Sequence, residues 1–429
     1  MDGERNFANM ARNMTGDNGQ ALQPFMSNSP WAGPGVFRQI QAEITATPAL
    51  AQGSTLILDE SADEKAGTPN AGASRQDNGR LGTVDVCRVD TCLTYANAAG
   101  GLGAMVDGEL FLPEEWFGPD FAQRRKELGI PEERTFETKI ALGLQMVKRA
   151  KAQGLPFELL ACDALYGRDN QFRADLDMEG VRYAAQVPAD TRVYLSAPRV
   201  GIPQKRSKRG QPRTRLQVLS PHPPQEVRTL ASSPSTLWHH IHVRQTERGR
   251  LEADFAIKQV WTVAEGKRPR VEWLVIRRDA EGDCAYTLLN APAAPPAPHL
   301  MVGSCQRYCT ERTFEDAKTE IGWDEFQAQK YRAWEHHVAL TGLALWFVAQ
   351  TKLAWAQTYA RDPALARQWE VEVLPALSTA NVRELLKAVL PVPQLTLQQA
   401  TELVITQLVN RARSTSSRLR CQVKPHDSS

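Results

Sequence analysis

Cysteine is scarce in this 429-residue sequence, and its distribution argues against a disulfide framework. The seven cysteines are scattered, their number is odd, and none forms a C-x-x-C pair. This pattern fits a reducing compartment better than a secreted protein. Cys305 and Cys309 have helical spacing, but no second Cys or His pair lies at the distance typical of zinc ligands. We therefore expect no structural zinc site.

Long hydrophobic runs and several common catalytic motifs are also lacking. The N-terminus, MDGERNFANMARN, has no apolar segment typical of a signal peptide. The most apolar stretch, residues 338–355, is interrupted by polar residues, whereas a membrane span needs about 20 mainly apolar residues. We expect a buried helix there, in a soluble, cytoplasmic protein without a membrane partner. The sequence has no Gly-rich phosphate loop and no G-x-S-x-G motif, so neither ATP use nor esterase chemistry is indicated.

The whole chain has no large excess of positive or negative charge, but one short segment is strongly basic. The net charge is only +2, from 51 basic and 49 acidic residues, which neither supports nor excludes nucleic-acid binding. Residues 204–215, QKRSKRGQPRTR, contain six basic residues and no acidic one: Lys205, Arg206, Lys208, Arg209, Arg213 and Arg215. Such a run is either a DNA-backbone contact, which releases counterions, or a flexible solvated loop.

Two short apolar runs each end in an aspartate. Residues 55–59 and 157–163 are typical of buried strands, and they end at Asp59 and Asp163. Between them we expect two strands at 84–95 and 103–112, and a helix at 135–153 with Thr135 as N-cap. Residues 60–83 are predicted to form a long loop. The order of elements predicts an α/β core with a parallel strand pair, whose carboxyl ends are the expected position of a site.

The whole chain divides into five predicted segments. A helical N-terminal segment is followed by the first part of an α/β core, a β-rich insertion, the second part of the core, and a helical C-terminal region with a basic tail. Their predicted bounds are residues 1–52, 53–180, 181–298, 299–360 and 361–429.

The strand-end carboxylates are candidate metal ligands. Two carboxylates that converge repel each other unless a cation or a proton intervenes. In phosphoryl-transfer enzymes a pair of divalent metal ions commonly resolves this conflict, and carboxylate oxygens favour Mg²⁺ or Mn²⁺. The alternative is that these aspartates only cap helices or form turns. Glu60, beside Asp59, remains a competitor for the first ligand position.

A third carboxylate lies on a predicted helix at residues 307–320. At about 100° per residue, Glu311 and Lys318 lie within about 40° of Arg307 on the helix surface. Glu311 is the favoured ligand of this helix and Glu315, at about 80° from Arg307, is the runner-up. A solvated, salt-bridged helix face is the alternative explanation for the pattern.

The spacing of Arg307, Glu311 and Lys318 resembles the Tyr-Arg-Glu-Lys signature of a large group of bacterial insertion-sequence transposases of the DDE type. Further segments resemble one branch of that group in the same order along the chain, namely residues 20–40, 56–61, 109–116, 159–172 and 312–340. The resemblance implies a ribonuclease-H-like catalytic domain, a mixed sheet flanked by helices, with the β-rich insertion between the second Asp and the Glu.

The resemblance also implies roles for individual residues. Asp59, Asp163 and Glu311 are then the catalytic metal ligands, with two Mg²⁺ (or Mn²⁺) ions expected. Arg307 and Lys318 are then DNA contacts near the scissile phosphate. The sequence departs from the signature at Ser304, where the Tyr is usual, so a phosphate contact is absent there or supplied by another residue.

The implied activity is metal-dependent DNA cleavage and strand transfer in cut-and-paste transposition. Its partners are double-stranded DNA, as terminal inverted repeats and target, and a second copy of the chain in a homodimer on DNA. The protein is then associated with the nucleoid when bound to DNA. Two alternatives stay open: an inactive or truncated transposase-derived DNA-binding protein, and a ribonuclease-H-like nuclease without strand transfer.

Overall fold

The structure is a computed structural model. It describes residues 21–64, 70–78, 82–97, 101–203, 214–246, 249–291, 301, 303–305, 307–325, 328–359, 362–368, 376–389, 396–398, 401–402, 405, 409 and 413.

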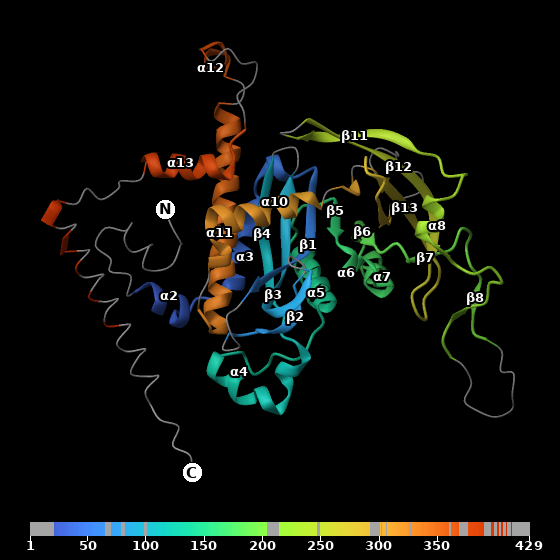
Figure 1. The fold of residues 1–429 in the computed structure, drawn as a ribbon, viewed down its shortest axis with the longest axis horizontal. Helices are drawn as coiled ribbons and strands as arrows, with labels where there is room; N and C mark the ends of the chain where they lie inside the picture. Colours follow the sequence, from blue (N-terminus) through green and yellow to red (C-terminus); the bar gives the residue numbers. More distant parts are fainter. Residues whose placement is uncertain are drawn as a thin grey trace.

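One large mixed sheet runs through the molecule (Figure 1). Its ten strands follow the order β11-β12-β13-β14-β6-β5-β1-β3-β2, and β4 also pairs with β3. The core strands are β1 (Ser54–Glu64), β2 (Ser74–Asn78), β3 (Thr83–Asn97), β4 (Leu102–Leu110), β5 (Leu159–Cys162) and β6 (Tyr183–Val187). Strand β5 is parallel to both β1 and β6, whereas β2, β3 and β4 pair antiparallel. The sheet is the mixed, helix-flanked sheet that the sequence predicted.

Four further strands extend this sheet beyond β6 through antiparallel pairs. They are β11 (His239–Thr246), β12 (Gly249–Thr262), β13 (Arg270–Arg278) and β14 (Cys284–Leu289). Two small pairs lie beside them: β7 (Arg192–Val193) with β10 (Gln225–Glu226), and β8 (Val200–Gly201) with β9 (Gln217–Val218). The described residues between 188 and 289 are therefore β-rich, and β11–β14 continue the core sheet.

Helices flank the sheet on both faces and at its edge (Figure 1). From the N-terminus the helices of the described residues are α2 (Leu22–Asn28), α3 (Gly33–Thr45), η1 (Pro48–Leu50), η2 (Glu114–Phe117), η3 (Pro119–Phe121), α4 (Ala122–Leu128), α5 (Lys139–Ala152), α6 (Ala164–Gly167), α7 (Asn170–Met178), α8 (Val227–Ala231), α10 (Tyr308–Asp316), η4 (Ala317–Ile321), η5 (Trp323–Glu325), α11 (Tyr331–Thr358), α12 (Pro363–Gln368) and α13 (Thr379–Val389). Of these, α12 lies beyond the end of α11, away from the sheet (Figure 1).

Strand β1 contacts helices on both faces of the sheet, because successive side chains of a strand point to opposite faces. Leu58 packs against α5, where Gly143 leaves no room for a Cβ: an ideal one would lie 2.5 Å from the Leu58 side chain. Ile57, on the opposite face, packs with Cys309 of α10. Asp59 therefore faces the α10 side of the sheet, and Glu60 faces the α5 side.

The long helix α11 confirms the helix predicted for residues 338–355, but its buried face ends at Ala349, and Leu343 and Phe347 are exposed. It packs on β4 and α3, and its Gly342 lies against Phe37 and the Met105 carbonyl oxygen. His336 is fully buried and stacks on Trp31 with ring centroids 3.7 Å apart. Among the described residues, α11 is the one helix long and apolar enough to cross a membrane, a test that core helices also pass.

Two sequence predictions about local structure were wrong, and a third was confirmed except for its last turn. Residues 60–83 are not all loop, because β1 continues to Glu64 and β2 forms at 74–78; a 2.9 Å ion pair between Arg88 and Asp63 holds the polar end of β1 to β3. Helix α5 begins later than expected, with Thr138 as the N-cap whose hydroxyl accepts from the Ala141 amide. The helix predicted for 307–320 ends in a π-helical turn, η4, before Gly322 at φ +86°.

A buried ion network joins the insertion to the core. Glu272 of β13 is fully buried and accepts from Arg173 of α7 at 2.9 Å and from the Tyr183 hydroxyl at 2.7 Å. Burial opposes the charge on Glu272, but Arg173 and Arg270 hold the pKa of this carboxyl below its usual value. Arg173 also donates to the Gly167 carbonyl oxygen, so the network reaches the turn that follows β5.

Candidate active site

Asp59 and Asp163 lie where the parallel pairing of β1 with β5 ends. Asp163 follows the last residue of β5, whereas Asp59 is in the middle of β1, which continues to Glu64 along β3. Leu58 pairs with Cys162 in the β1–β5 register, so the two aspartates follow in adjacent positions. The Asp59 side chain is only 14% exposed. Burial raises the pKa of Asp59 to about 6, the positive charge of Arg307 opposes this effect, and the charges of Asp163 and Glu60 add to it. The sheet thus brings the two carboxylates together, as the sequence predicted.

Asp163 also caps the short helix α6. Its Oδ1 accepts from the Leu165 amide at 3.0 Å and from the Tyr166 amide at 3.5 Å. Gly167 then packs so closely on β6 that an ideal Cβ would lie 1.8 Å from the Gln186 carbonyl oxygen. The C-D-A-L-Y-G segment therefore holds Asp163 rigidly at the strand end, and the cap employs only one of its carboxylate oxygens.

Arg307 connects Glu311 with the sheet. At the N-terminus of α10, its Nη2 donates to Glu311 Oε1 at 2.9 Å and its Nη1 donates to Gln186 Oε1 at 3.1 Å. Its Nε lies 3.8 Å from Asp59 Oδ2. The Glu311 side chain is 61% exposed. We call Asp59, Asp163, Glu311 and Arg307 the carboxylate site.

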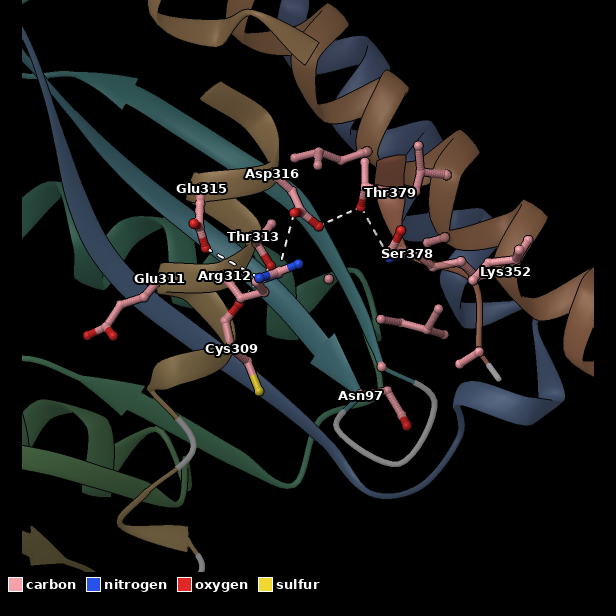
Figure 2. Close-up of a pocket in the computed structure, with 18 of the residues that line it drawn as sticks. Asn97, Cys309, Glu311, Arg312, Thr313, Glu315, Asp316, Lys352, Ser378 and Thr379 are labelled. Atoms are coloured by element: carbon pink, nitrogen blue, oxygen red, sulfur yellow. Dashed lines mark hydrogen bonds and ion pairs between the residues drawn. The ribbon is translucent and has the colours of Figure 1, made fainter. Parts of the chain in front are cut away.

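The competing acids have other partners. Glu60 faces α5, where Lys139 contacts it at 2.7 Å and Tyr166 donates to it at 3.4 Å. Burial raises the pKa of Glu60, although Lys139 opposes this effect. Glu315 pairs with Arg312 at 3.5 Å, and Figure 2 shows Glu311 pointing away from that pair. The geometry therefore favours Asp59 over Glu60, and Glu311 over Glu315, as members of one site.

Lys318 lies in η4, so the ideal-helix stripe with Arg307 does not extend to it. Its Nζ is 5.6 Å from the centre of the Trp323 ring. Its charge nevertheless counteracts the burial-driven rise in the pKa of Cys92, the residue opposite Asp59 in the β1–β3 register.

Most of the basic run lies outside the described residues. This applies to Lys205, Arg206, Lys208, Arg209 and Arg213. Arg215 is described: it is exposed and pairs with Glu265 at 2.8 Å. The β8–β9 pair closes the base of the segment that carries the run. Ser304, at the signature's Tyr position, is buried and donates to the Met301 carbonyl oxygen at 2.6 Å.

A cavity of about 890 Å³ lies between α10, α11, the β3–β4 hairpin and the start of α13 (Figure 2). Lys352 donates to Thr379 there at 3.2 Å, and Thr379 in turn donates to Asp316. Burial lowers the pKa of Lys352. Glu311 lies at the rim of this cavity but its carboxylate points away from it, so the cavity and the carboxylate site are on different sides of α10.

The donor set of the carboxylate site suits a hard divalent cation, because all its ligand atoms are carboxylate oxygens. Among the residues that the structure describes, no three His, Cys, Asp or Glu side chains converge closely enough to hold a metal ion. Glu311 is held by Arg307 instead. The sequence did not point to Gln186, since a single polar residue in a strand carries no signal and its partner Arg307 is 121 residues away.

Comparison with known proteins relates the chain to a family of endonucleases. A family model described as "DDE superfamily endonuclease" matches residues 1–250, which include Asp59 and Asp163 but not Arg307 or Glu311. A probable transposase for the insertion sequence element IS701, from Microchaete diplosiphon, is 26% identical over 180 residues. The aligned region covers 42% of this chain and 43% of that protein, so the chain matches less than half the length of this relative.

Proposed function

Because the chain belongs to the DDE superfamily of endonucleases, we propose that it is an insertion-sequence transposase that cleaves DNA at element ends and joins them to target DNA. The observation that carries the proposal is that Asp59 and Asp163 each follow the last residue pair of the β1–β5 register, Leu58 with Cys162. Arg307 lies 3.8 Å from Asp59 and contacts Glu311 at 2.9 Å. The likeness to the probable IS701 transposase supports the choice of transposition among endonuclease activities.

Members of this superfamily use divalent metal ions, and we assign the metal ligands of this chain to Asp59, Asp163 and Glu311. The buried Asp59 carboxyl, with its pKa raised to about 6, is a group whose ionised form a cation would stabilise. Two Mg²⁺ or Mn²⁺ ions bound there would supply a nucleophile at neutral pH and neutralise charge on the attacked phosphate.

The chain's own residues position the DNA in this proposal. Arg307 and Lys318 contact the phosphate beside the scissile bond, where a guanidinium can donate two hydrogen bonds. Water attacks the phosphorus and the bond to the 3′ oxygen breaks, which leaves a 3′-OH and a 5′-phosphate. That 3′-OH then attacks a phosphorus of the opposite strand or the target strand in line. The new phosphodiester bond forms as the P–O3′ bond of the attacked strand breaks and leaves a 3′-OH there, so no covalent enzyme–DNA intermediate is needed.

The proposed partners are two element ends, a target duplex and a second copy of the chain. Two ends must be processed together, so we expect a homodimer on DNA. The basic run at 204–215 contacts the DNA backbone, which would make binding steeply dependent on salt. The proposed location is the cytoplasm, at the nucleoid when DNA is bound.

The test is a cleavage and joining assay with the purified chain. The substrate is a plasmid that carries the DNA flanking the chain's own gene, incubated with Mg²⁺, with Mn²⁺ or with EDTA. We expect metal-dependent nicks at paired inverted repeats, and joining of pre-cut ends with a free 3′-OH to a target plasmid. Nicking without joining would support a ribonuclease-H-like nuclease. DNA binding without any metal-dependent cleavage would support a transposase-derived DNA-binding protein.

A further inference from the structure

Each nitrogen of the Arg307 guanidinium faces a different strand or helix of the carboxylate site. Nη1 donates to Gln186 of β6 and Nη2 donates to Glu311 of α10. Nε is buried, has no hydrogen-bond partner, and lies 3.8 Å from Asp59 Oδ2. Other buried Arg Nε atoms of the described residues also lack a hydrogen-bond partner, but this one lies beside a carboxylate that the proposed function assigns to metal binding.

We propose that Arg307 is the internal counter-ion of the metal-free carboxylate site, and that a metal ion must displace its guanidinium from Glu311 in order to bind. The inference rests on the proposed function, since it takes the same carboxylates as metal ligands. It goes further because it gives Arg307 a second task, competition with the metal, besides contact with DNA phosphate.

The charges of the site favour such an exchange. Asp59, Asp163 and Glu311 bring three negative charges to one region, and Arg307 is the cation that contacts two of them. The Glu311 side chain is 61% exposed, so it can turn away from Arg307 into solvent at small cost, whereas Asp59 is fixed in the sheet. Glu311 is therefore the ligand whose release completes the metal site.

Gln186 is the positioning residue of this exchange. Gln186 lies in strand β6, and its side-chain oxygen accepts a hydrogen bond from Arg307 Nη1 at 3.1 Å. Arg307 therefore remains hydrogen-bonded to the sheet when the Glu311 side chain turns away. The guanidinium then retains its place beside Asp59 with its Nη2 open to an incoming phosphate. A lysine cannot do the same, because its ammonium is a point charge without the planar fork of donors.

If Arg307 competes with the metal ion, replacing Arg307 should change the metal affinity of the protein. If Arg307 only contacts DNA, replacing it should not. Removal of Arg307 leaves Glu311 without its competing partner and Asp59 without its nearest cation. An ion pair with one exposed partner corresponds to about a 2- to 5-fold change in a dissociation constant, so Arg307→Gln should bind Mn²⁺ about that much more tightly than the unchanged protein. A residue that contacts only DNA would leave metal binding in the absence of DNA unchanged.

The experiment is Mn²⁺ titration of the full chain without DNA, read as the electron paramagnetic resonance signal of free Mn²⁺. The matched control is Arg312→Gln, which removes the same charge from the next turn position of α10 but affects Glu315 and Asp316. We expect tighter binding for Arg307→Gln, an intermediate constant for Arg307→Lys, and no change for Arg312→Gln. Equal or weaker binding by a folded Arg307→Gln, or equal tightening by Arg312→Gln, would overturn the proposal.

Asp163→Asn separates this inference from the proposed function. If Mn²⁺ binding does not depend on Asp163, the metal site itself is misassigned and both ideas fail. If binding depends on Asp163 but is not tightened by Arg307→Gln, the metal site stands and only the counter-ion role is lost. Circular dichroism and thermal melts establish that each variant is folded, and Arg307→Lys keeps the inference testable if the glutamine variant does not fold.

Discussion

Replacement of Asp59 by Asn should stabilise the protein when it is kept metal-free with EDTA at pH 8. The Asp59 carboxyl is 14% exposed in the sheet, and burial raises its pKa from 3.8 to about 6. At pH 8 the group is ionised in both the folded and the unfolded chain, so the folded chain bears the cost of the buried charge. The difference between 3.8 and about 6 corresponds to about 3 kcal/mol.

The sign of the effect depends on pH. A carboxyl whose folded pKa is raised contributes stability that is fully present below its unfolded pKa, near 3.8, and lost as the pH rises through about 6. Asp59→Asn should therefore gain about 1 to 3 kcal/mol at pH 8, the lower bound allowing for the lost attraction of Arg307, and little at pH 4. Asp107, whose pKa burial also raises to about 6, titrates alike in both proteins and cancels from the comparison.

The assay is urea denaturation at both pH values, followed by circular dichroism, with free energies of unfolding from linear extrapolation. Asp190→Asn, the same chemical change at an exposed turn, is the control and should change neither value. A variant at Asp59 that is less stable than the unchanged protein at pH 8 would refute the reasoning, as would an equal gain at both pH values.

Three further predictions concern the framework and the DNA contacts. Glu272→Gln leaves Arg173 as a buried, uncompensated charge and should cost about 3 to 5 kcal/mol in the free energy of unfolding by urea, whereas the exposed Glu265→Gln should cost almost nothing. Gly167→Ala forces a Cβ against the Gln186 carbonyl oxygen and should cost about 1 to 3 kcal/mol in the same assay; a neutral effect would contradict the close packing. Replacement of the basic residues of 204–215 by Gln should weaken DNA binding and reduce the salt dependence of log Kd by about 0.9 per lost phosphate contact, and an unchanged slope in filter-binding titrations would indicate a solvated loop.

The two buried strands that carry Asp59 and lead to Asp163 could be predicted from the sequence because they depend on local patterns. Apolar runs that end in Asp59 and Asp163 mark buried strands, and the β1–β5 register places the ends of the two apolar runs side by side, although β1 itself continues to Glu64. The spacing of Arg307 and Glu311 likewise predicted one helix face, and the 2.9 Å contact between them agrees with it. In each case the residues concerned either lie close together in the sequence or follow a recognisable apolar run.

The features that the sequence did not reveal depend on residues far apart in the chain. Gln186 and Arg307 are separated by 121 residues, and Arg173 and Glu272 by 99, so no local spacing relates them. The π-helical turn that carries Lys318 ends at Gly322, whose positive φ terminates the helix. A prediction based on a regular period of 3.6 residues does not include such a turn. Strand β2 is polar and short, and it forms because β3 offers it an edge to pair with.

The central claim is that Asp59, Asp163 and Glu311 act as one metal-dependent site on DNA, and Asp163→Asn tests it most directly. Asparagine can cap α6 as aspartate does, so the variant should fold and bind DNA nearly as well as the unchanged protein, measured in Ca²⁺. Loss of several kcal/mol of transition-state stabilisation should reduce Mg²⁺-dependent cleavage about 1,000-fold or more. The control Asp169→Asn, which keeps the cap of α7, should cleave normally. Normal cleavage by Asp163→Asn would contradict the account.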